Sequence, residues 1–295
     1  MAKAAPSSPP TPAPTPTPGG PARAPSLAFT QAERELGPLE RMGESTLALL
    51  ESLGRIGELF VLSVGAIFKR PFELRSIVYQ MDSLGVRSVG IASITAVFIG
   101  MVMAVQFAFG LQKFGGMEYT GRVIGLSFSR ELAPTLTAVI VGGRIGSGMA
   151  AEVGSMAVTE QIDAIRALGA DPIKKLVLPR LVAATLVMPI LAAFALVLGF
   201  SGAMVVTSTQ FDIPMGFFLR TALGSVGMGD FWSGICKCPF FGAIIALVGC
   251  HFGLQTRGGT EGVGRATTQS VVVISIAILI ADFFLTKLFM AIWTK

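Results

Sequence analysis

The sequence has little charge, a single histidine and only three cysteines. Of its 295 residues, 14% are charged and 52% are hydrophobic, a balance that excludes an ordinary soluble domain and favours a polytopic membrane protein. Cys236 and Cys238 lie two residues apart in an apolar run, and His251 has no second histidine to join it. The usual zinc-binding patterns are therefore excluded, and we expect no metal site.

Nucleotide-binding motifs are missing as well. Neither a GxxxxGK[ST] nor a GxGxxG pattern occurs, so the glycine-rich loops that hold phosphate groups are not recognisable in this chain. We expect no cofactor here, and any ATP must be bound by another subunit. The net charge of +5 does not indicate a nucleic-acid partner, because the basic residues lie beside apolar runs. Anionic lipid and the positive-inside rule account for such basic residues.

The N-terminal part differs in composition from the rest. Residues 1–38 are dominated by Pro, Ala, Thr and Ser, which predicts a disordered tail. Residues 39–295 are expected to form one membrane domain. It begins with residues 45–68, whose charged and apolar faces predict a helix. Its wholly apolar part is too short to cross a bilayer, so we expect an interfacial helix, with a buried helix as the alternative.

Five longer apolar runs predict transmembrane helices, since a span needs about 20 residues. They cover residues 88–110, 123–143, 181–206, 231–254 and 271–293. The expected fold is therefore an all-α polytopic membrane protein. Eleven Lys and Arg residues flank one set of span ends and three flank the other, which predicts a cytoplasmic N-terminus and a C-terminus on the opposite side. The three are Lys113, Arg122 and Arg220.

The segment between the second and third spans, residues 144–178, is patterned more strongly than a plain loop. Its apolar residues recur at spacings of four, three and three: Val158, Ile162, Ile165 and Leu168. This spacing places them on one face of a short amphipathic helix. Gly169 and Pro172 predict where the helix ends. Its polar face would be available to a cytoplasmic partner.

Four charged residues lie inside the predicted spans: Arg130, Glu131, Lys237 and Asp282. A charge near the bilayer centre costs on the order of 3 kcal/mol, so such residues usually pair or face a polar cavity. We expect one network, with Arg130 and Lys237 set against Glu131 and Asp282. Two readings stay open: the ion pairs fix helix packing, or they couple helix movement to substrate passage.

Two stretches carry a resemblance to a known family. Residues 130–179, RELAPTLTAVIVGGRIGSGMAAEVGSMAVTEQIDAIRALGADPIKKLVLP, closely resemble the MlaE-type permeases of bacterial MCE-linked lipid ABC transporters. Residues 262–285, GVGRATTQSVVVISIAILIADFFL, are similar to the last span of the same family. The resemblance covers the chain from about residue 47 to its C-terminus, and the Pro-rich tail departs from it.

The resemblance implies an assembly and a substrate. Such permeases are homodimers in the bacterial inner membrane, with two cytoplasmic ATPase subunits that bind ATP and Mg²⁺. An MCE-domain protein lies on the periplasmic side, and some systems add a STAS-domain protein. The implied substrate is phospholipid or a related amphiphile, moved between the membrane and the MCE protein. The short helix after the second span would be the coupling helix, and its implied ATPase contacts are Glu152, Glu160, Asp163 and Arg166.

A homodimer with five spans per subunit can enclose a cavity for two acyl chains. Candidate wall residues are Phe107, Phe109, Leu111, Ile276 and Leu279, although ordinary lipid-facing or packing roles explain each one singly. Two other functions are less consistent with the sequence. An ion-coupled secondary transporter would use the buried carboxylates, but no internal repeat is evident. An intramembrane enzyme would use Glu131 or Asp282 as a base, but neither has a nearby nucleophile or histidine in sequence.

Overall fold

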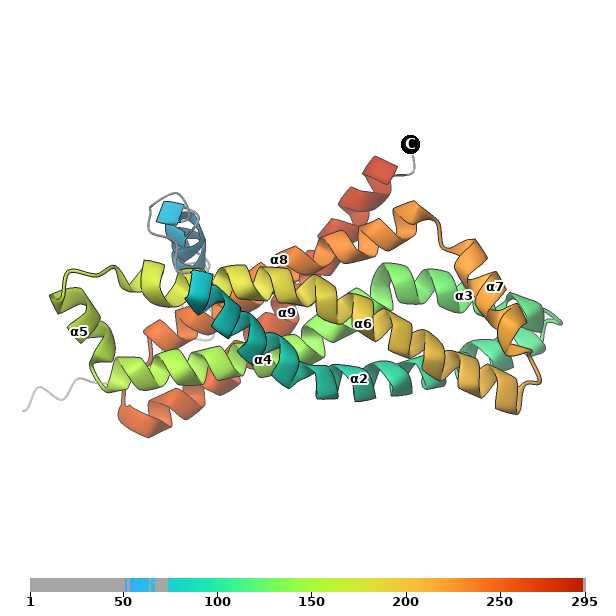
Figure 1. The fold of residues 1–295 in the computed structure, drawn as a ribbon, viewed down its shortest axis with the longest axis horizontal. Helices are drawn as coiled ribbons and strands as arrows, with labels where there is room; N and C mark the ends of the chain where they lie inside the picture. Colours follow the sequence, from blue (N-terminus) through green and yellow to red (C-terminus); the bar gives the residue numbers. More distant parts are fainter. Residues whose placement is uncertain (1–50, 52–53, 64, 67–73, 294–295) are drawn as a thin grey trace, which may run out of the picture. The chain divides into compact units, whose positions relative to one another are not determined.

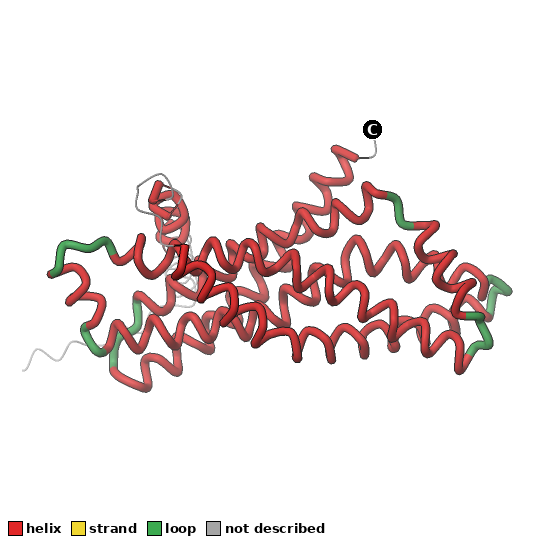
Figure 2. Tube along the Cα trace, viewed as in Figure 1, coloured by secondary structure: helices red, strands yellow, loops and turns green. Residues whose placement is uncertain are grey.

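The computed structural model describes residues 51, 54–63, 65–66 and 74–293, and these residues form helices and turns without a strand (Figure 2). The tail expected over residues 1–38 lies outside this part of the chain. Of the helix expected over residues 45–68, the stretch 54–63 is described and is helical. The expectation of an all-α fold is confirmed for the described residues.

Five helical segments are long and apolar enough to cross a membrane, as predicted. The first is α2 (Leu74–Gln112), and the second joins η1 (Met117–Tyr119), α3 (Thr120–Ser127), η2 (Phe128–Leu132) and α4 (Ala133–Val158). The third joins η3 (Ile173–Val177) and α6 (Leu178–Gln210), the fourth is α8 (Met228–Leu254), and the fifth is α9 (Gly259–Trp293). The short helices α5 (Gln161–Ala167) and α7 (Met215–Ser225) lie between spans (Figure 1).

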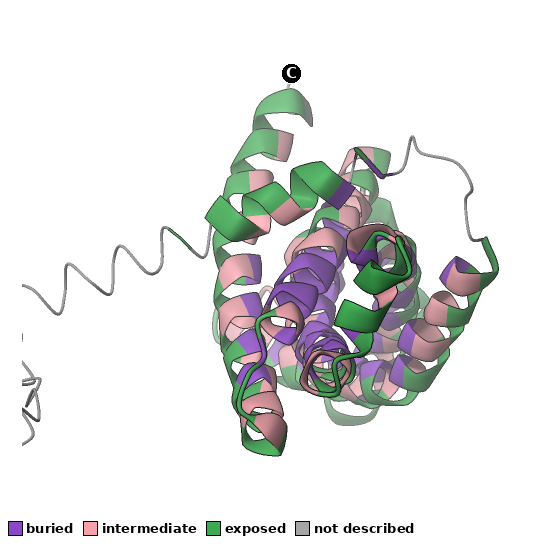
Figure 3. Cartoon of the chain, turned by 90° about the vertical axis from the view of Figure 1, so that its left-hand side faces the viewer, coloured by how far each residue is buried: buried purple, intermediate pink, exposed green. Residues whose placement is uncertain are grey.

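Helix α4 is the packing centre of the membrane domain. It contacts α2, α6, α8 and α9, while α2 packs along α6 and α3 packs on α7. The largest buried cluster is drawn from α4, α6 and α8, with Ile274 and Ile278 of α9 closing one side. Figure 3 shows the buried residues on the faces that the helices turn toward one another. In contrast, the outward faces of α2 and α9 are apolar and exposed, as expected of a protein surrounded by lipid.

Glycines bring the helices close together at two crossings. A Cβ atom added to Gly100 of α2 would lie 2.0 Å from the carbonyl oxygen of Gly199 in α6. A Cβ atom added to Gly249 of α8 would lie 2.9 Å from the carbonyl oxygen of Gly146 in α4. Since both distances are below any normal contact, only glycine allows these backbones to approach so closely.

The segment between the second and third spans differs in detail from the prediction. Val158 belongs to the end of α4, and the chain turns at Glu160, which has a left-handed φ of 59°. Helix α5 is therefore shorter than expected and carries only Ile162 and Ile165 inward, because Leu168 follows its last turn and is 85% exposed. The predicted ending holds: Gly169 has a left-handed φ of 77°, which favours glycine after a helix.

Candidate functional site

A break in the second span positions the first two charged residues. Between α3 and α4 the helix widens into the π-helical turn η2, which contains Arg130 and Glu131. Pro134 follows as the second residue of α4 and has no N–H to donate to the carbonyl four residues earlier, that of Arg130. Such π-turns often occur at functional sites. Here the freed carbonyl of Arg130 accepts a hydrogen bond from the Lys237 Nζ atom at 3.2 Å.

Lys237 of α8 is the centre of the site. Its side chain is 1% exposed, and its Nζ atom lies 2.8 Å from the Glu131 carboxylate and 3.2 Å from the Asp282 carboxylate. The ammonium also donates to the Thr286 hydroxyl at 2.6 Å. One cation thus connects η2, α8 and α9. The three N–H groups of the ammonium are shared among these four oxygens, which offset the large cost of its desolvation.

Helix α9 contributes two residues on one face. Asp282 and Thr286 are four residues apart, so both point toward Lys237. The Thr286 hydroxyl lies 3.2 Å from both Glu131 oxygens and 2.8 Å from the Asp282 main-chain carbonyl, either of which can take its single proton. The structure therefore brings Lys237, Glu131 and Asp282 together as the sequence pattern predicted, with Thr286 as an added member.

Arg130 makes a different pair from the one expected. Its guanidinium binds the carboxylate of Asp230 in the first turn of α8, with the Nε atom at 2.6 Å. The other Asp230 oxygen accepts the main-chain N–H of Gly227 at 2.9 Å and so caps the start of α8. Arg130 is 44% exposed, whereas Asp230 is 17% exposed. The expected pairing of Arg130 with Glu131 or Asp282 is absent from the described residues, because Arg130 in the π-turn pairs with Asp230 at the start of α8.

A small polar cavity of about 110 Å³ borders this network. It is lined by Arg130, Glu131, Asp230, Lys237 and Thr286, with Phe289 of α9 on its apolar side. Glu131 is 38% exposed and Lys237 is 1% exposed, although both line the cavity. A polar space of this size has room for a few water molecules. The ion pairs thus join η2, α8 and α9 around one cavity.

The implied ATPase contacts divide into two groups. Glu160, Asp163 and Arg166 are exposed at α5, and Asp163 pairs with Arg166 at 3.0 Å. Glu152 instead lies on α4 and holds the guanidinium of Arg180 at 2.8 Å. Arg180 is 4% exposed and also donates to the Leu176 carbonyl at 2.7 Å. Glu152 is thus joined to the start of α6, but its side chain is 56% exposed, so all four residues are accessible on the surface of the chain.

The five candidate wall residues lie on two helices. Phe109, Ile276 and Leu279 are each more than half exposed, whereas Phe107 and Leu111 are half-buried. Phe107 packs against the cluster around Phe218 of α7. Because α2 packs along α6 while α9 packs on α4 and α8, the two groups do not form one wall within a single chain.

Comparison with known proteins identifies the family. The model of the family described as Permease MlaE matches residues 77–288. The chain belongs to the MlaE permease family. A probable ABC transporter permease protein of Synechocystis is 44% identical over 214 residues, covering 72% of this chain and 81% of the relative. A probable ABC transporter permease protein of Rickettsia prowazekii is 36% identical over 248 residues, covering 84% of this chain and 96% of the relative.

A plant protein is also similar to this MlaE-family chain. The chloroplastic protein TRIGALACTOSYLDIACYLGLYCEROL 1 of Arabidopsis thaliana is 37% identical over 223 residues. The match covers 76% of this chain and 64% of the plant protein. These relatives and the five apolar helices together make the chain a multi-pass permease subunit of an ABC transporter.

Three residues of the permease's polar networks were missed by the sequence reasoning: Asp230, Thr286 and Arg180. Asp230 stands three residues after Gly227 at the start of a span, a spacing typical of a helix cap. Thr286 stands four residues after Asp282, which could have marked it as a neighbour. Arg180 is one of the eleven basic residues that flank the predicted cytoplasmic span ends, and nothing in its sequence context indicates burial.

Proposed function

We propose that this chain moves phospholipid or a related amphiphile between the bacterial inner membrane and a periplasmic MCE-domain protein. ATP hydrolysis in a separate subunit drives the movement. The observation that carries the proposal is the family match over residues 77–288, which spans all five apolar helices. The name of the Arabidopsis relative includes the name of a glycerolipid, and this supports a lipid as the substrate class.

In this proposal two copies of the chain form the translocation path. A cytoplasmic ABC ATPase dimer, which binds ATP and Mg²⁺, docks on α5 through Glu160, Asp163 and Arg166. Their exposure on a short helix that contacts the packing centre α4 supports this role, because a movement of α5 would be transmitted to α4 through these contacts. The N-terminus lies in the cytoplasm and the C-terminus in the periplasm, and a STAS-domain protein joins the ATPase in systems that have one.

The acyl chains would contact the exposed apolar faces of α2 and α9, which carry Phe109, Ile276 and Leu279. Phe107 and Leu111 would support the wall from behind. The Lys237 network joins η2 to α8 and α9, and thus ties the broken second span to the helix that carries part of this wall. A change in its ion pairs would alter how α9 lies against α8.

The proposal is tested by co-purification of the chain with an ABC ATPase from its own source. The full chain should retain the ATPase through purification, and the variant Glu160→Lys with Asp163→Lys should lose it. Glu118→Lys is the matched control, since Glu118 is an exposed acid at the opposite end of the spans and should leave capture unchanged. If the intact, folded chain retains no ATPase, the proposal fails and ion-coupled transport through the buried carboxylates takes its place.

A further inference from the structure

A polar cavity of about 440 Å³ lies between α5 and the turn that joins α8 to α9. Glu160, Asp163 and Arg166 line it on the side of α5, and Arg257 lines it on the side of the turn. It shares no residue with the cavity beside the Lys237 network. The α8–α9 turn therefore borders the same space as the residues proposed to meet the ATPase.

The α8–α9 turn is held against α4 by close packing. A Cβ atom added to Gly154 of α4 would lie 2.8 Å from the hydroxyl oxygen of Thr256, which is buried. Gly258 follows with a φ of 87°, in the left-handed region that favours glycine. Arg257 stands between Thr256 and Gly258, so the backbone holds it beside the cavity.

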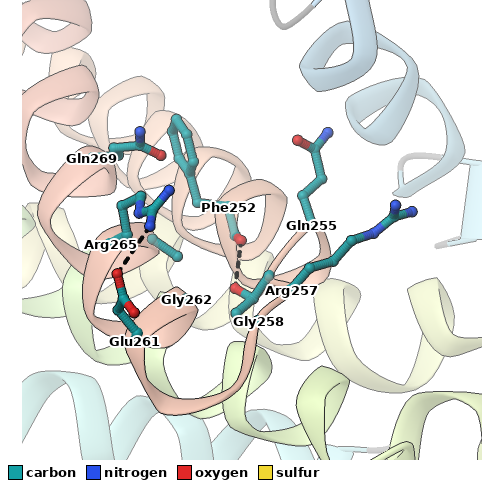
Figure 4. Close-up of a pocket in the computed structure, with 10 residues that line it drawn as sticks. Phe252, Gln255, Arg257, Gly258, Glu261, Gly262, Arg265 and Gln269 are labelled. Carbon is teal, nitrogen blue, oxygen red and sulfur yellow. Dashed lines mark hydrogen bonds and ion pairs between the residues drawn. The ribbon is translucent and has the colours of Figure 1, made fainter. Parts of the chain in front are cut away.

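Arg257 is directed away from the neighbouring charges of α9. Figure 4 shows its side chain extending away from Glu261 and Arg265, which pair with each other at 3.2 Å. Arg257 is exposed, and within the described part of the chain its guanidinium has no hydrogen bond or ion pair. Its charge is therefore available to a partner.

Glu160 carries the opposite charge in the same cavity. Its φ of 59° is left-handed, a conformation that costs glutamate more than glycine, and such strained positions cluster at functional sites. Asp163 is already paired with Arg166. Glu160 and Arg257 form no ion pair with each other or with any other described residue. The cavity thus presents an unpaired carboxylate and an unpaired guanidinium.

The mixed charge of this cavity favours a protein surface over a lipid phosphate. Two arginines and two carboxylates line it, so its formal charge is zero. A phosphate group beside Arg257 would also approach Glu160 and Asp163, and like charges repel. A protein can present an acidic side chain to one residue and a basic side chain to the other, and such complementary charges fix the register of two surfaces.

We infer that the α8–α9 turn is a second docking element for the ABC ATPase. Arg257 binds an acidic side chain of the ATPase, and Glu160 binds a basic one. Helix α9 begins at Gly259, directly after the turn, and carries Asp282, which binds Lys237. The ATPase is therefore joined to α9 as well as to α4. The inference rests on the proposed function in taking an ATPase as the partner, and it adds a docking element and the charges it recognises.

The test measures the dissociation constant between the full chain in lipid nanodiscs and the ABC ATPase co-purified from its own source. Arg257→Glu should raise it at least about tenfold, because an attractive contact becomes a repulsive one. Arg257→Lys keeps the charge and should stay within about threefold. Arg265→Glu reverses an exposed arginine of the neighbouring cavity and is the control, with a change below about twofold. Equal thermal melting of all variants verifies folding.

A double variant separates an ATPase contact from a pair within the chain. Glu160→Gln and Arg257→Gln should each weaken ATPase binding, and their effects should add, because the two residues meet different side chains of the ATPase. If the double variant loses no more affinity than either single variant, the two residues serve each other and the inference is overturned.

Three further results would contradict the docking role of the turn. ATPase binding by Arg257→Glu as tight as that of the intact chain would remove the turn from the interface. Equal weakening by Arg265→Glu would show only a general effect of positive charge. Weakening that disappears in nanodiscs without anionic lipid would make Arg257 a lipid contact.

Failure of this inference is distinguishable from failure of the proposed function. If the intact chain binds no ATPase, the proposed function fails and the inference fails with it. If Glu160→Lys with Asp163→Lys loses the ATPase while Arg257→Glu keeps it, the proposed function stands and this inference alone is wrong.

Discussion

Lys237 and Glu131 form an ion pair of 2.8 Å in which the cation is 1% exposed and the anion 38% exposed. The carboxylate is therefore partly accessible, while the ammonium is buried between η2 and α9. This asymmetry makes Lys237 the residue on which the network depends. Glu131 and Asp282 would face each other as two like charges without it.

The first prediction concerns the stability of this network. Lys237→Met should lower the free energy of unfolding by about 3–5 kcal/mol, because it leaves two carboxylates without their shared cation. Adding Glu131→Gln and Asp282→Asn to the same chain should recover most of that loss. Unfolding is measured in a mild detergent, with circular dichroism as the signal. Equal stability of the single and triple variants would show that the charges do not interact.

Transport distinguishes the two readings of the same network. If it couples helix movement to substrate passage, Asp282→Lys should abolish transport, and adding Lys237→Asp should restore part of it. Transport is measured as lipid transfer by the reconstituted complex, with protein amounts matched. Wild-type transport by both Asp282→Ala and Lys237→Ala would reduce the network to a packing role.

In the ion pair between Arg130 and Asp230, mutation of the aspartate should destabilise the protein more than mutation of the arginine. Asp230→Asn weakens both the ion pair and the cap on the Gly227 N–H, so we expect a loss of about 1–2 kcal/mol. Arg130→Gln removes only a partly exposed pair and should cost less than about 1 kcal/mol. Unfolding of the two variants is compared under identical conditions. A larger loss for Arg130→Gln would contradict the capping role.

Glu152 should act on stability, since it holds the buried Arg180. Glu152→Ala removes the carboxylate and leaves that guanidinium with the Leu176 carbonyl as its hydrogen-bond partner, and we expect a loss of about 1–3 kcal/mol. Asp163→Asn is the control, because its pair with Arg166 is exposed on both sides and is worth less than about 1 kcal/mol. The melting temperatures of the two variants are compared. Equal melting temperatures would show that Glu152 does not stabilise the fold.

The crossing of α2 and α6 offers a test within one helix. Gly100→Ala should destabilise the protein, since the new methyl group would overlap the Gly199 carbonyl. Gly90→Ala, also in α2, has no atom within 4 Å of the added carbon. It should be neutral or stabilise by up to about 1 kcal/mol, as alanine favours helix. Similar effects of both substitutions on the melting temperature would contradict the close crossing.

The five spans were predictable because long apolar runs leave few alternatives in a membrane. The clustering of Lys237, Glu131 and Asp282 also followed from the cost of burying charge. In contrast, the partner of Arg130 depends on the π-turn η2, whose position is set by packing against α8 and by Pro134. A regular helix through the same residues would have directed Arg130 elsewhere.

The α4–α5 corner shows a second limit of sequence patterns. The apolar spacing from Val158 to Leu168 indicates one helix, but the chain turns at Glu160 between them. Glutamate has no special preference for a left-handed conformation, so no local signal marks the turn. The burial of Arg180 is equally invisible, because an arginine beside a span is expected to face water or lipid headgroups.

The most direct test of the account is lipid transfer by the reconstituted permease, ATPase and MCE protein. Labelled phospholipid in proteoliposomes is measured on the MCE protein with ATP present, with ATP absent, and with the proton gradient collapsed. We expect transfer that requires ATP and is unaffected by loss of the gradient. Transfer that follows the proton gradient without ATP would contradict it and would assign the buried carboxylates a proton-carrying role.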